Sequence, residues 1–295
     1  RQSGETHRRA DAPRRTRLKT PCIASRPQDQ GGADEANPEG AGEVVGPDRG
    51  HEEEACFNKK VEGVGKRSDA GSSEKSEGRP DWFPHWPGSV CVVVGGGPSN
   101  KRVDFRRAEE EAGPEVRWIC VNNAYRLLQR PDVVYGCDAR WWRIYGQEVS
   151  ARGHFGLTQS REIVKEYPNL RRVRSVPRVD EILTEEFGSI GWGSNGGFQA
   201  VKLAVQFGAS RILLLGLDYS IEKGVHFHGR HQPPLSNPRQ ASVDKWRGIL
   251  DRQAPIFEKL GIEVINCAPH SRLAAYPRMP ILDALKLPAP AMEET

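Results

Sequence analysis

The stretch SVCVVVGGGPS, residues 89–99, decides the fold of this chain. Residues 90–94 are continuously apolar and rich in β-branched valine, and glycines and a proline end the run. A short apolar run of β-branched side chains is typical of a strand that is buried on both faces of a parallel sheet. The glycines and the proline indicate a turn directly after it. We therefore predict a parallel strand at residues 89–94 that leads into a glycine-rich loop.

Short apolar strands and helices alternate along the rest of the chain. Further strands are predicted at residues 116–121, 132–137, 211–215 and 262–265, and helices at 104–112, 124–129, 196–207 and 243–260. Gly208 and Gly261 follow two of these helices, and glycine is a common residue just past a helix end. The alternation predicts an α/β fold, a Rossmann-like and mostly parallel sheet with helices on both faces.

The composition divides the 295-residue chain into two parts. Residues 1–80 carry equal numbers of basic and acidic side chains and few large apolar ones. Such a segment cannot bury enough apolar surface to offset the entropy lost on ordering. We expect a disordered polar tail at residues 1–85, one folded domain at residues 86–288 and a flexible C-terminus at residues 289–295.

Several classes of protein are disfavoured by charge and hydropathy. The longest apolar runs, residues 90–94 and 212–217, fall far short of the roughly 18 residues that a membrane helix needs. The net charge is +4 and basic residues are scattered among acids, so nothing indicates nucleic-acid binding. The six cysteines form no C-x-x-C pair, which fits a reducing, cytoplasmic setting. The sequence is compatible with a homo-oligomer.

The candidate ligand-binding residues follow the predicted strands, because ligands of open parallel sheets bind beyond the carboxyl ends of the strands. The glycine loop can bring successive amides to a phosphate, although it lacks the P-loop lysine and the dinucleotide-binding spacing. A plain tight turn and a simple helix cap are the structural alternatives at the glycine-rich loops. The candidate nucleotide-binding residues are Gly95, Gly96, Gly97, Pro98, Ser99, Asn122, Asn123, Gly193, Ser194, Asn195, Gly196 and Asp218.

Three histidines, His226, His228 and His231, lie within six residues of one another in a polar loop. Because histidine titrates near neutral pH, we predict His228 or His231 as a general base, with Asp138 as a further catalytic residue. A zinc site is the rival interpretation of the same spacing. The loop offers no cysteine partner and no fixed helix, so the sequence analysis predicts no metal.

Longer motifs resemble a known superfamily across about residues 89–285. SNGGFQAVKLAVQFGASRILLLGLDY (residues 194–219) is the most specific of them, and NCAPHSRLAAYP (residues 266–277) is the second. Together with the glycine loop they resemble a superfamily that joins archaeal 6-hydroxymethylpterin diphosphokinase-like (MptE-like) proteins to bacterial sialyltransferase-like glycosyltransferases. Uncharacterised bacterial and phage members are the most similar.

The two branches of this superfamily imply different chemistry. Sialyltransferase-like members hold a cytidine nucleotide without metal and use a histidine base, whereas diphosphokinase-like members carry acidic runs for Mg²⁺ and ATP. Here Arg140 and Arg230 stand where further acids would be expected. The resemblance thus slightly favours a nucleotide-dependent transferase that moves a glycosyl group from a nucleotide sugar to a small-molecule or glycan acceptor. Diphosphate transfer from Mg²⁺-ATP to a pterin-like acceptor is one alternative, and a non-catalytic nucleotide-binding module is another.

Overall fold

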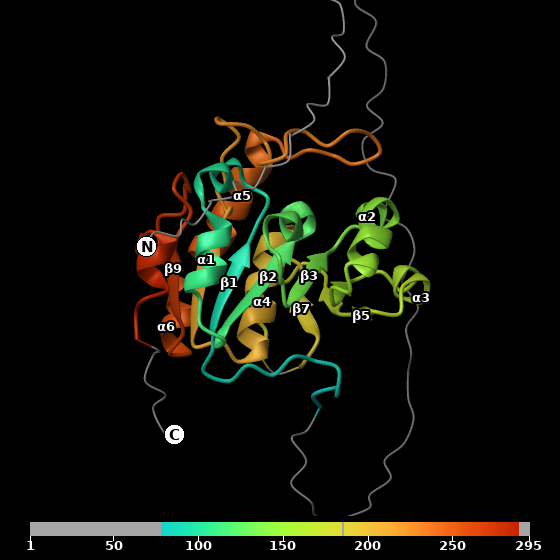
Figure 1. The fold of residues 1–295 in the computed structure, drawn as a ribbon, viewed down its shortest axis with the longest axis horizontal. Helices are drawn as coiled ribbons and strands as arrows, with labels where there is room; N and C mark the ends of the chain where they lie inside the picture. The colour runs from blue at the N-terminus through green and yellow to red at the C-terminus, as the bar shows by residue number, and fades with distance from the viewer. Residues whose placement is uncertain (1–77, 185, 289–295) are drawn as a thin grey trace, which may run out of the picture. The chain divides into compact units, whose positions relative to one another are not determined.

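The computed structural model describes residues 78–184 and 186–288, and its centre is a sheet of seven strands in the order β5-β4-β3-β2-β1-β8-β9 (Figure 1). Every neighbouring pair in this sheet is parallel. The α/β, Rossmann-like fold is therefore confirmed. The strands are β1 (Val90–Val94), β2 (Val116–Val121), β3 (Val133–Gly136), β4 (Gly156–Thr158), β5 (Leu170–Arg172), β8 (Arg211–Leu215) and β9 (Glu263–Asn266).

Both faces of the sheet are covered by helices, which explains the continuous apolar run in β1. Cys91 and Val93 pack in the core layer of α4 (Gly196–Phe207), and Val92 and Val94 pack in the layer of α1 (Phe105–Glu111). Successive side chains of a strand point to opposite faces, so a strand buried on both sides needs apolar residues at every position. In Figure 1, α1 lies in front of β1 and α4 lies behind the sheet.

The predicted helix at residues 243–260 is two helices, α5 (Gln240–Asp251) and α6 (Ala254–Lys259). Pro255 lies in the first turn of α6. Proline lacks an N–H and clashes with the carbonyl four residues earlier, so one helix cannot run through this position. The predicted helix at residues 124–129 is a 3₁₀ turn, η2 (Asn122–Leu127), which begins one residue after β2.

The segment between β3 and α4 contains elements that the sequence analysis did not predict. They include β4, β5 and a separate parallel pair formed by two further strands. Each of these strands is three residues long, too short to show a periodicity in the sequence. The remaining elements are α2 (Ala139–Ala151), α3 (Ile163–Glu166), β6 (Arg174–Val176), β7 (Ser189–Gly191), η1 (Pro98–Arg102) and α7 (Ile281–Ala284).

The packed part of the chain begins earlier than the predicted boundary at residue 86. Phe83 is 3% exposed, and its ring meets that of Phe207 edge to face with the centroids 5.0 Å apart. Trp86 also packs on Phe207, at 4.7 Å between centroids. The predicted tail at residues 1–77 and the predicted flexible residues 289–295 lie outside the described residues.

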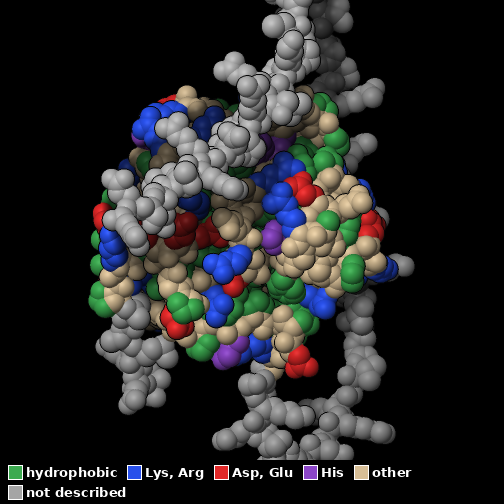
Figure 2. All heavy atoms as spheres, in the orientation of Figure 1, with side chains coloured by type: hydrophobic (Ala, Val, Ile, Leu, Met, Phe, Trp, Pro, Cys, Tyr) green, Lys and Arg blue, Asp and Glu red, His purple; other side chains and the backbone are tan. Residues whose placement is uncertain are grey.

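The surface of the described part carries charges of both signs. Figure 2 shows Lys and Arg side chains intermixed with Asp and Glu on the face that it presents. Within residues 78–184 and 186–288, no helix is long and apolar enough to cross a bilayer. The four cysteines of this part are unpaired.

The order of the strands locates the binding crevice. From β1 the chain moves through β2, β3 and β4 to β5 on one side, whereas β8 and β9 lie on the other side of β1. The strand order therefore reverses between β1 and β8, which pair in parallel with Val94 beside Leu215 at their carboxyl ends. In open parallel sheets, ligands bind beyond the carboxyl ends of the strands at such a reversal.

Candidate functional site

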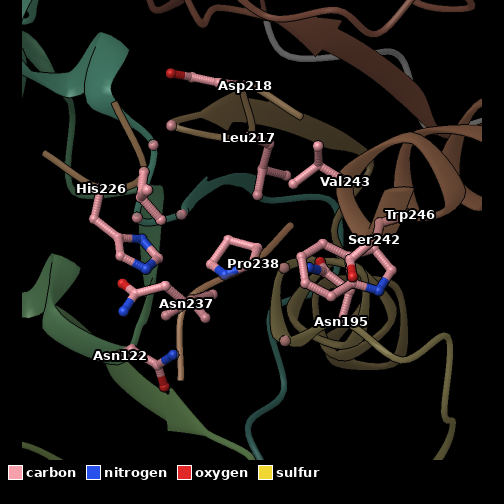
Figure 3. Close-up of a pocket in the computed structure, with 18 of the residues that line it drawn as sticks. Asn122, Asn195, Leu217, Asp218, His226, Asn237, Pro238, Ser242, Val243 and Trp246 are labelled. Carbon is pink, nitrogen blue, oxygen red and sulfur yellow. The ribbon is translucent and has the colours of Figure 1, made fainter. Parts of the chain in front are cut away.

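A pocket of about 390 Å³ lies at this edge of the sheet, where the loops after β1, β2, β3 and β8 meet the N-terminus of α4. In the view of Figure 3, Asn122, His226 and Asn237 lie on one side and Asn195, Ser242 and Trp246 on the other. Pro98, Ser99 and Gly193 were predicted site residues but are not among those lining it. The predicted residues that line the pocket are Gly95, Gly96, Gly97, Asn122, Asn123, Asp138, Ser194, Asn195, Gly196, Asp218, His228 and His231.

The first glycine-rich loop is tied to the end of β8. The N–H of Gly95 donates to the Leu215 carbonyl, and the N–H of Gly97 donates to the Gly216 carbonyl, both at 2.8 Å. A Cβ at Gly95 or at Gly97 would lie 2.6 Å from the Gly216 oxygen. Glycine is needed at both positions because two backbones approach each other closely here.

Asp218 closes the same loop from the β8 side. Its Oδ2 accepts from the Ser99 N–H at 2.8 Å, and its Oδ1 accepts from the Ser99 hydroxyl. Burial raises the pKa of this carboxyl, and the bonds from Ser99 oppose that rise. Since Pro98 has no N–H, Gly96 carries the one amide of the loop without a hydrogen-bond partner in the described structure. The loop therefore does not offer successive free amides, and its part in nucleotide binding stays a prediction.

The second glycine-rich loop has the free amides that the first lacks. Gly193 and Ser194 both adopt a φ of +51°, and Asn195 then caps α4 by accepting from the Phe198 N–H at 3.0 Å. The N–H groups of residues 194–197 have no partner in the described part of the chain, and all four residues line the pocket. The N-terminus of this 12-residue helix also carries a partial positive charge. Helix capping by Asn195 therefore leaves the amides of residues 194–197 free.

The two neighbouring asparagines have different roles. The Oδ1 of Asn123 accepts from Trp141 Nε1 at 2.7 Å, and Asn123 is 2% exposed, so it holds α2 against η2. Asn122 has a φ of +51°, and its buried Oδ1 has no hydrogen-bond partner in the described structure. Unusual backbone strain and an unsatisfied buried oxygen both mark Asn122 as the residue open to a ligand.

Asp138 begins α2 and faces the pocket. Its Oδ1 accepts from the Arg140 N–H at 2.8 Å as a helix cap, and Arg140 Nε lies 3.6 Å from the same oxygen. Its negative charge raises the pKa of His231, against the lowering by burial. Asp138 is therefore a capping residue whose charge also reaches the histidine loop.

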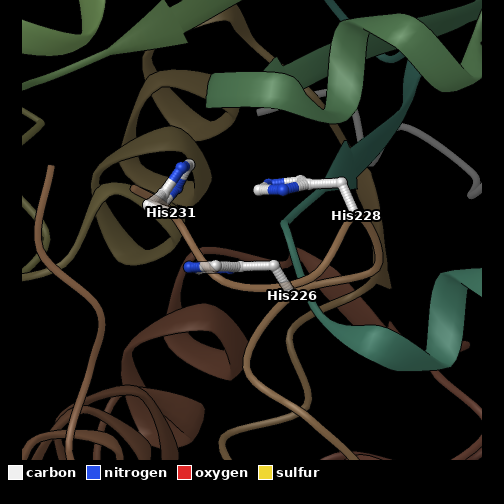
Figure 4. Close-up of side chains that lie close together, drawn as sticks. All are labelled: His226, His228 and His231. Atoms are coloured by element: carbon white, nitrogen blue, oxygen red, sulfur yellow. The ribbon is translucent and has the colours of Figure 1, made fainter. Parts of the chain in front are cut away.

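The three histidines lie together on the pocket wall. Figure 4 shows the rings of His226 and His228 nearly parallel, with His231 facing them. The ring centroids are 5.1 Å apart for His226 and His228, 4.6 Å for His226 and His231, and 4.8 Å for His228 and His231. The loop thus brings three imidazoles from six residues of sequence to one place.

Two sets of backbone contacts hold this loop. The N–H of Phe227 donates to the Gly96 carbonyl at 2.9 Å. Asn237 accepts from the His231 N–H at 2.8 Å and donates to the His231 carbonyl at 2.9 Å. Asn237 was not predicted, and an Asn-Pro turn after the histidines is the sequence signal that could have indicated it.

The imidazoles are held in the neutral form. Burial, followed by the neighbouring imidazoles, lowers the pKa of His226 to about 4, and burial and His231 lower that of His228 to about 4. Burial also lowers the pKa of His231. At neutral pH the three rings can accept a proton or donate a nitrogen lone pair to a ligand.

One wall of the pocket comes from α5, which the sequence analysis did not assign to the site. Ser242, Val243 and Trp246 line it from one face of that helix. Their spacing of three and four residues places them on one helix face, a pattern that is equally typical of ordinary core packing. Trp246 provides a broad, partly exposed aromatic surface for a ligand.

Fold and pocket together define a parallel α/β domain with a pocket at the reversal of strand order. No protein-family model and no curated protein matches the chain. Among the solved structures that match, one is the Bacillus cereus enoyl-acyl carrier protein reductase with NADP⁺ and indole naphthyridinone. It is 14% identical, with 68% of this chain and 80% of that chain covered and a TM-score of 0.25, which supports no inference about ligand or reaction here. The resemblance to MptE-like and sialyltransferase-like proteins stays a prediction.

Proposed function

We propose that this protein is a nucleotide-dependent transferase that binds the phosphate of its donor at the N-terminus of α4. The observation that carries this proposal is the set of free amides at residues 194–197, which open into the pocket at the reversal of strand order. Such a helix N-terminus favours an anion through both its N–H groups and its dipole. A phosphate there would leave the rest of the donor in the pocket.

Asn122 and Trp246 supply complementary contacts for the rest of a nucleotide. Asn122 offers an unpaired amide oxygen at the end of β2, suited to a base or ribose hydroxyl. Trp246 offers an aromatic face on which a base or sugar can pack. These two contacts support a nucleotide over a bare phosphate.

Glycosyl transfer from a nucleotide sugar is the reaction we favour. The acceptor hydroxyl attacks the anomeric carbon, the bond from that carbon to the nucleotide phosphate breaks, and the phosphate leaves with the electron pair. The histidine group, through His228 or His231, takes the proton of the acceptor, and a neutral imidazole is ready to do so. The resemblance to sialyltransferase-like proteins points in the same direction.

The carboxylates of the pocket weigh against diphosphate transfer from Mg²⁺-ATP. Magnesium is held by carboxylate oxygens together with substrate phosphates. Of the described residues that line the pocket, two are acidic, Asp138 and Asp218. Ser99 engages both oxygens of Asp218, and one oxygen of Asp138 caps α2. The pocket therefore offers little to a magnesium ion.

Isothermal titration tests the proposed function. The full chain is titrated with CMP and CTP in the presence of EDTA, and separately with ATP and Mg²⁺. We expect cytidine nucleotides to bind without metal. Binding that requires ATP and Mg²⁺ would instead support diphosphate transfer. If neither the cytidine nucleotides nor Mg²⁺-ATP bind, the transferase proposal is contradicted.

Turnover distinguishes an enzyme from a binding module. Release of the nucleotide from nucleotide sugars is followed by chromatography, without chelator, for the wild type and for His228→Ala and His231→Ala. We expect both variants to bind the nucleotide and at least one of them to lose most of the turnover. Unchanged turnover in both would remove the histidines from the reaction.

A further inference from the structure

We infer that His226, His228 and His231 form a binding site for a divalent transition-metal ion such as Zn²⁺. The sequence analysis predicted no metal, because the loop offers neither cysteine nor helix. In the structure, packing of the loop on the pocket wall brings the three imidazoles together without a cysteine or a helix. The ion can bind without a nucleotide. A role for the ion in proton transfer, however, rests on the proposed transferase function.

The ligand geometry is the first support for the site. One nitrogen from each ring can be chosen so that all three lie within 4.8 Å of one another. Zinc binds histidine nitrogen at about 2.0–2.1 Å, so tetrahedral ligands stand about 3.3 Å apart. Small rotations of the imidazoles, with no movement of the sheet, close this difference.

His226 supplies an independent observation. Its Nε2 is buried and has no hydrogen-bond partner in the described structure. On the other edge of the ring, Nδ1 faces Gly96, where an added Cβ would lie 3.1 Å from it. A buried imidazole nitrogen without a hydrogen-bond partner is available to a ligand.

Three charged side chains lie around the site, Arg126, Arg230 and Asp138. In addition to burial, Arg126 lowers the pKa of His228, but its guanidinium is paired with Glu148. Asp138 opposes these cations with a negative charge near His231.

The donor set selects the class of ion. Imidazole nitrogen suits Zn²⁺, Co²⁺, Ni²⁺ and Cu²⁺, whereas Mg²⁺ and Ca²⁺ prefer oxygen. Three protein ligands facing an open pocket leave a coordination position for water, as in catalytic zinc sites. An ion bound there would lower the pKa of such a water, and the hydroxide formed from it could take the proton that the proposed reaction otherwise gives to an imidazole.

Metal titration of the full chain tests the inference. The protein is stripped with EDTA, dialysed into metal-free buffer and titrated with ZnCl₂ by calorimetry and with CoCl₂ by visible absorption. We expect one ion per chain and the d–d absorption of cobalt in a site of low coordination number. The triple variant with His226, His228 and His231 all changed to Ala should lose both signals.

Single variants and a matched control make the result specific. His228→Ala should weaken Zn²⁺ binding about 100-fold or more. Loss of a residue that only hydrogen-bonds to a metal ligand already weakens metal binding by up to about 100-fold, and His228 is itself a proposed ligand. His85→Ala, an exposed histidine outside the pocket, should bind like the wild type. The triple variant keeps His7 and His51, so binding at those residues would persist in it.

Two outcomes would overturn the inference: no stoichiometric Zn²⁺ binding by the wild type, or equal binding by the triple variant. Thermal unfolding in EDTA shows whether the variants fold, and the exposed His228 provides a variant that leaves the half-buried ring of His226 intact. Nucleotide binding in EDTA is measured separately. Metal binding without nucleotide binding would refute the transferase alone, and the reverse would refute the metal site alone.

Discussion

At the scale of single residues, identical or similar side chains take different roles because of their neighbours. Asn123 is paired with Trp141, whereas the adjacent Asn122 is strained and has an unpaired oxygen. Asp218 follows a buried strand, as an active-site acid often does, yet Ser99 occupies both of its oxygens. Residue type and position alone do not separate these cases.

Changing Asn122 and Asn123 separately should divide binding from stability. Asn122→Gly relieves the positive φ and removes the free amide, so the melting temperature should hold or rise while CMP binds about five- to tenfold more weakly. Asn123→Ala leaves Trp141 Nε1 unpaired and should cost about 1–3 kcal/mol of stability. Thermal unfolding and calorimetric titration measure the two effects. Unchanged CMP affinity in Asn122→Gly would contradict the assignment.

Lys202 is a second residue whose environment decides its chemistry. It is fully buried in α4, and its Nζ has no hydrogen-bond partner in the described structure. Burial lowers its pKa from 10.5 to about 7, while Asp180 and Glu181 oppose the shift. The folded state therefore binds fewer protons than the unfolded chain between about pH 7 and 10.5, so stability falls as the pH drops through that window.

Lys202→Met should remove this pH dependence. The variant should be more stable than the wild type by about 1 kcal/mol or more at pH 7, with the difference shrinking towards pH 10.5. Urea unfolding at a series of pH values measures it. Lys245→Met, at an exposed position of α5, should show no such trend. A constant difference at all pH values would contradict the role of Lys202 titration.

At the scale of elements, the two glycine-rich loops look alike in sequence and do different work. In the loop after β1, the N–H groups of Gly95, Gly97 and Ser99 donate to residues at or just past the end of β8. The loop therefore joins the two strands. The loop before α4 keeps the amides of residues 194–197 free because they precede or begin the helix, where no earlier carbonyl is within reach. The proposed anion site therefore lies at the helix N-terminus and not at the longer run of glycines.

Two substitutions of Asn195 test this assignment. Asn195→Asp keeps a capping oxygen and adds a negative charge, so stability should hold while CMP affinity falls about tenfold or more. Asn195→Ala loses the cap and should cost about 1 kcal/mol of stability. Calorimetry and thermal unfolding separate the two. Equal CMP affinity in Asn195→Asp and the wild type would place the phosphate elsewhere.

At the scale of the whole molecule, one seven-stranded sheet organises the described residues, and the segment before β1 is part of its packing. Phe83 and Trp86 cover Phe207 at the end of α4. The N–H of Trp86 also donates to the Phe207 carbonyl at 2.5 Å. Removing these residues would expose an aromatic ring that is otherwise fully buried.

Truncation should therefore be tolerated up to residue 78 but not to residue 88. A chain that begins at residue 78 should unfold cooperatively with the melting temperature of the full chain. A chain that begins at residue 88 loses Phe83 and Trp86 and should be less stable by about 3 kcal/mol or more. Calorimetric unfolding of the three chains is the measurement. Equal stability of both truncations would show that the aromatic contacts contribute nothing.

Local patterns in the sequence determined the fold class and part of the pocket lining. β2 and β8 match the predicted ranges, because most of their positions carry the apolar side chains that a strand buried on both faces needs. The carboxyl ends of parallel strands meet at one edge, so residues such as Asn122, Asp138 and Asp218 were predicted together and lie in one pocket. These features depend on periodicity and on chain direction, which are local properties.

Tertiary structure alone decided which of those residues are free to act. Hydrogen bonds between distant segments satisfy Ser99, Asp218 and Asn123, and no sequence pattern records such a pairing. The same contacts leave the amides before α4 unpaired, and packing of the histidine loop buries Nε2 of His226 among the other rings. Availability for a ligand depends on which polar groups the fold has already satisfied, and that is settled only when segments far apart in the chain meet.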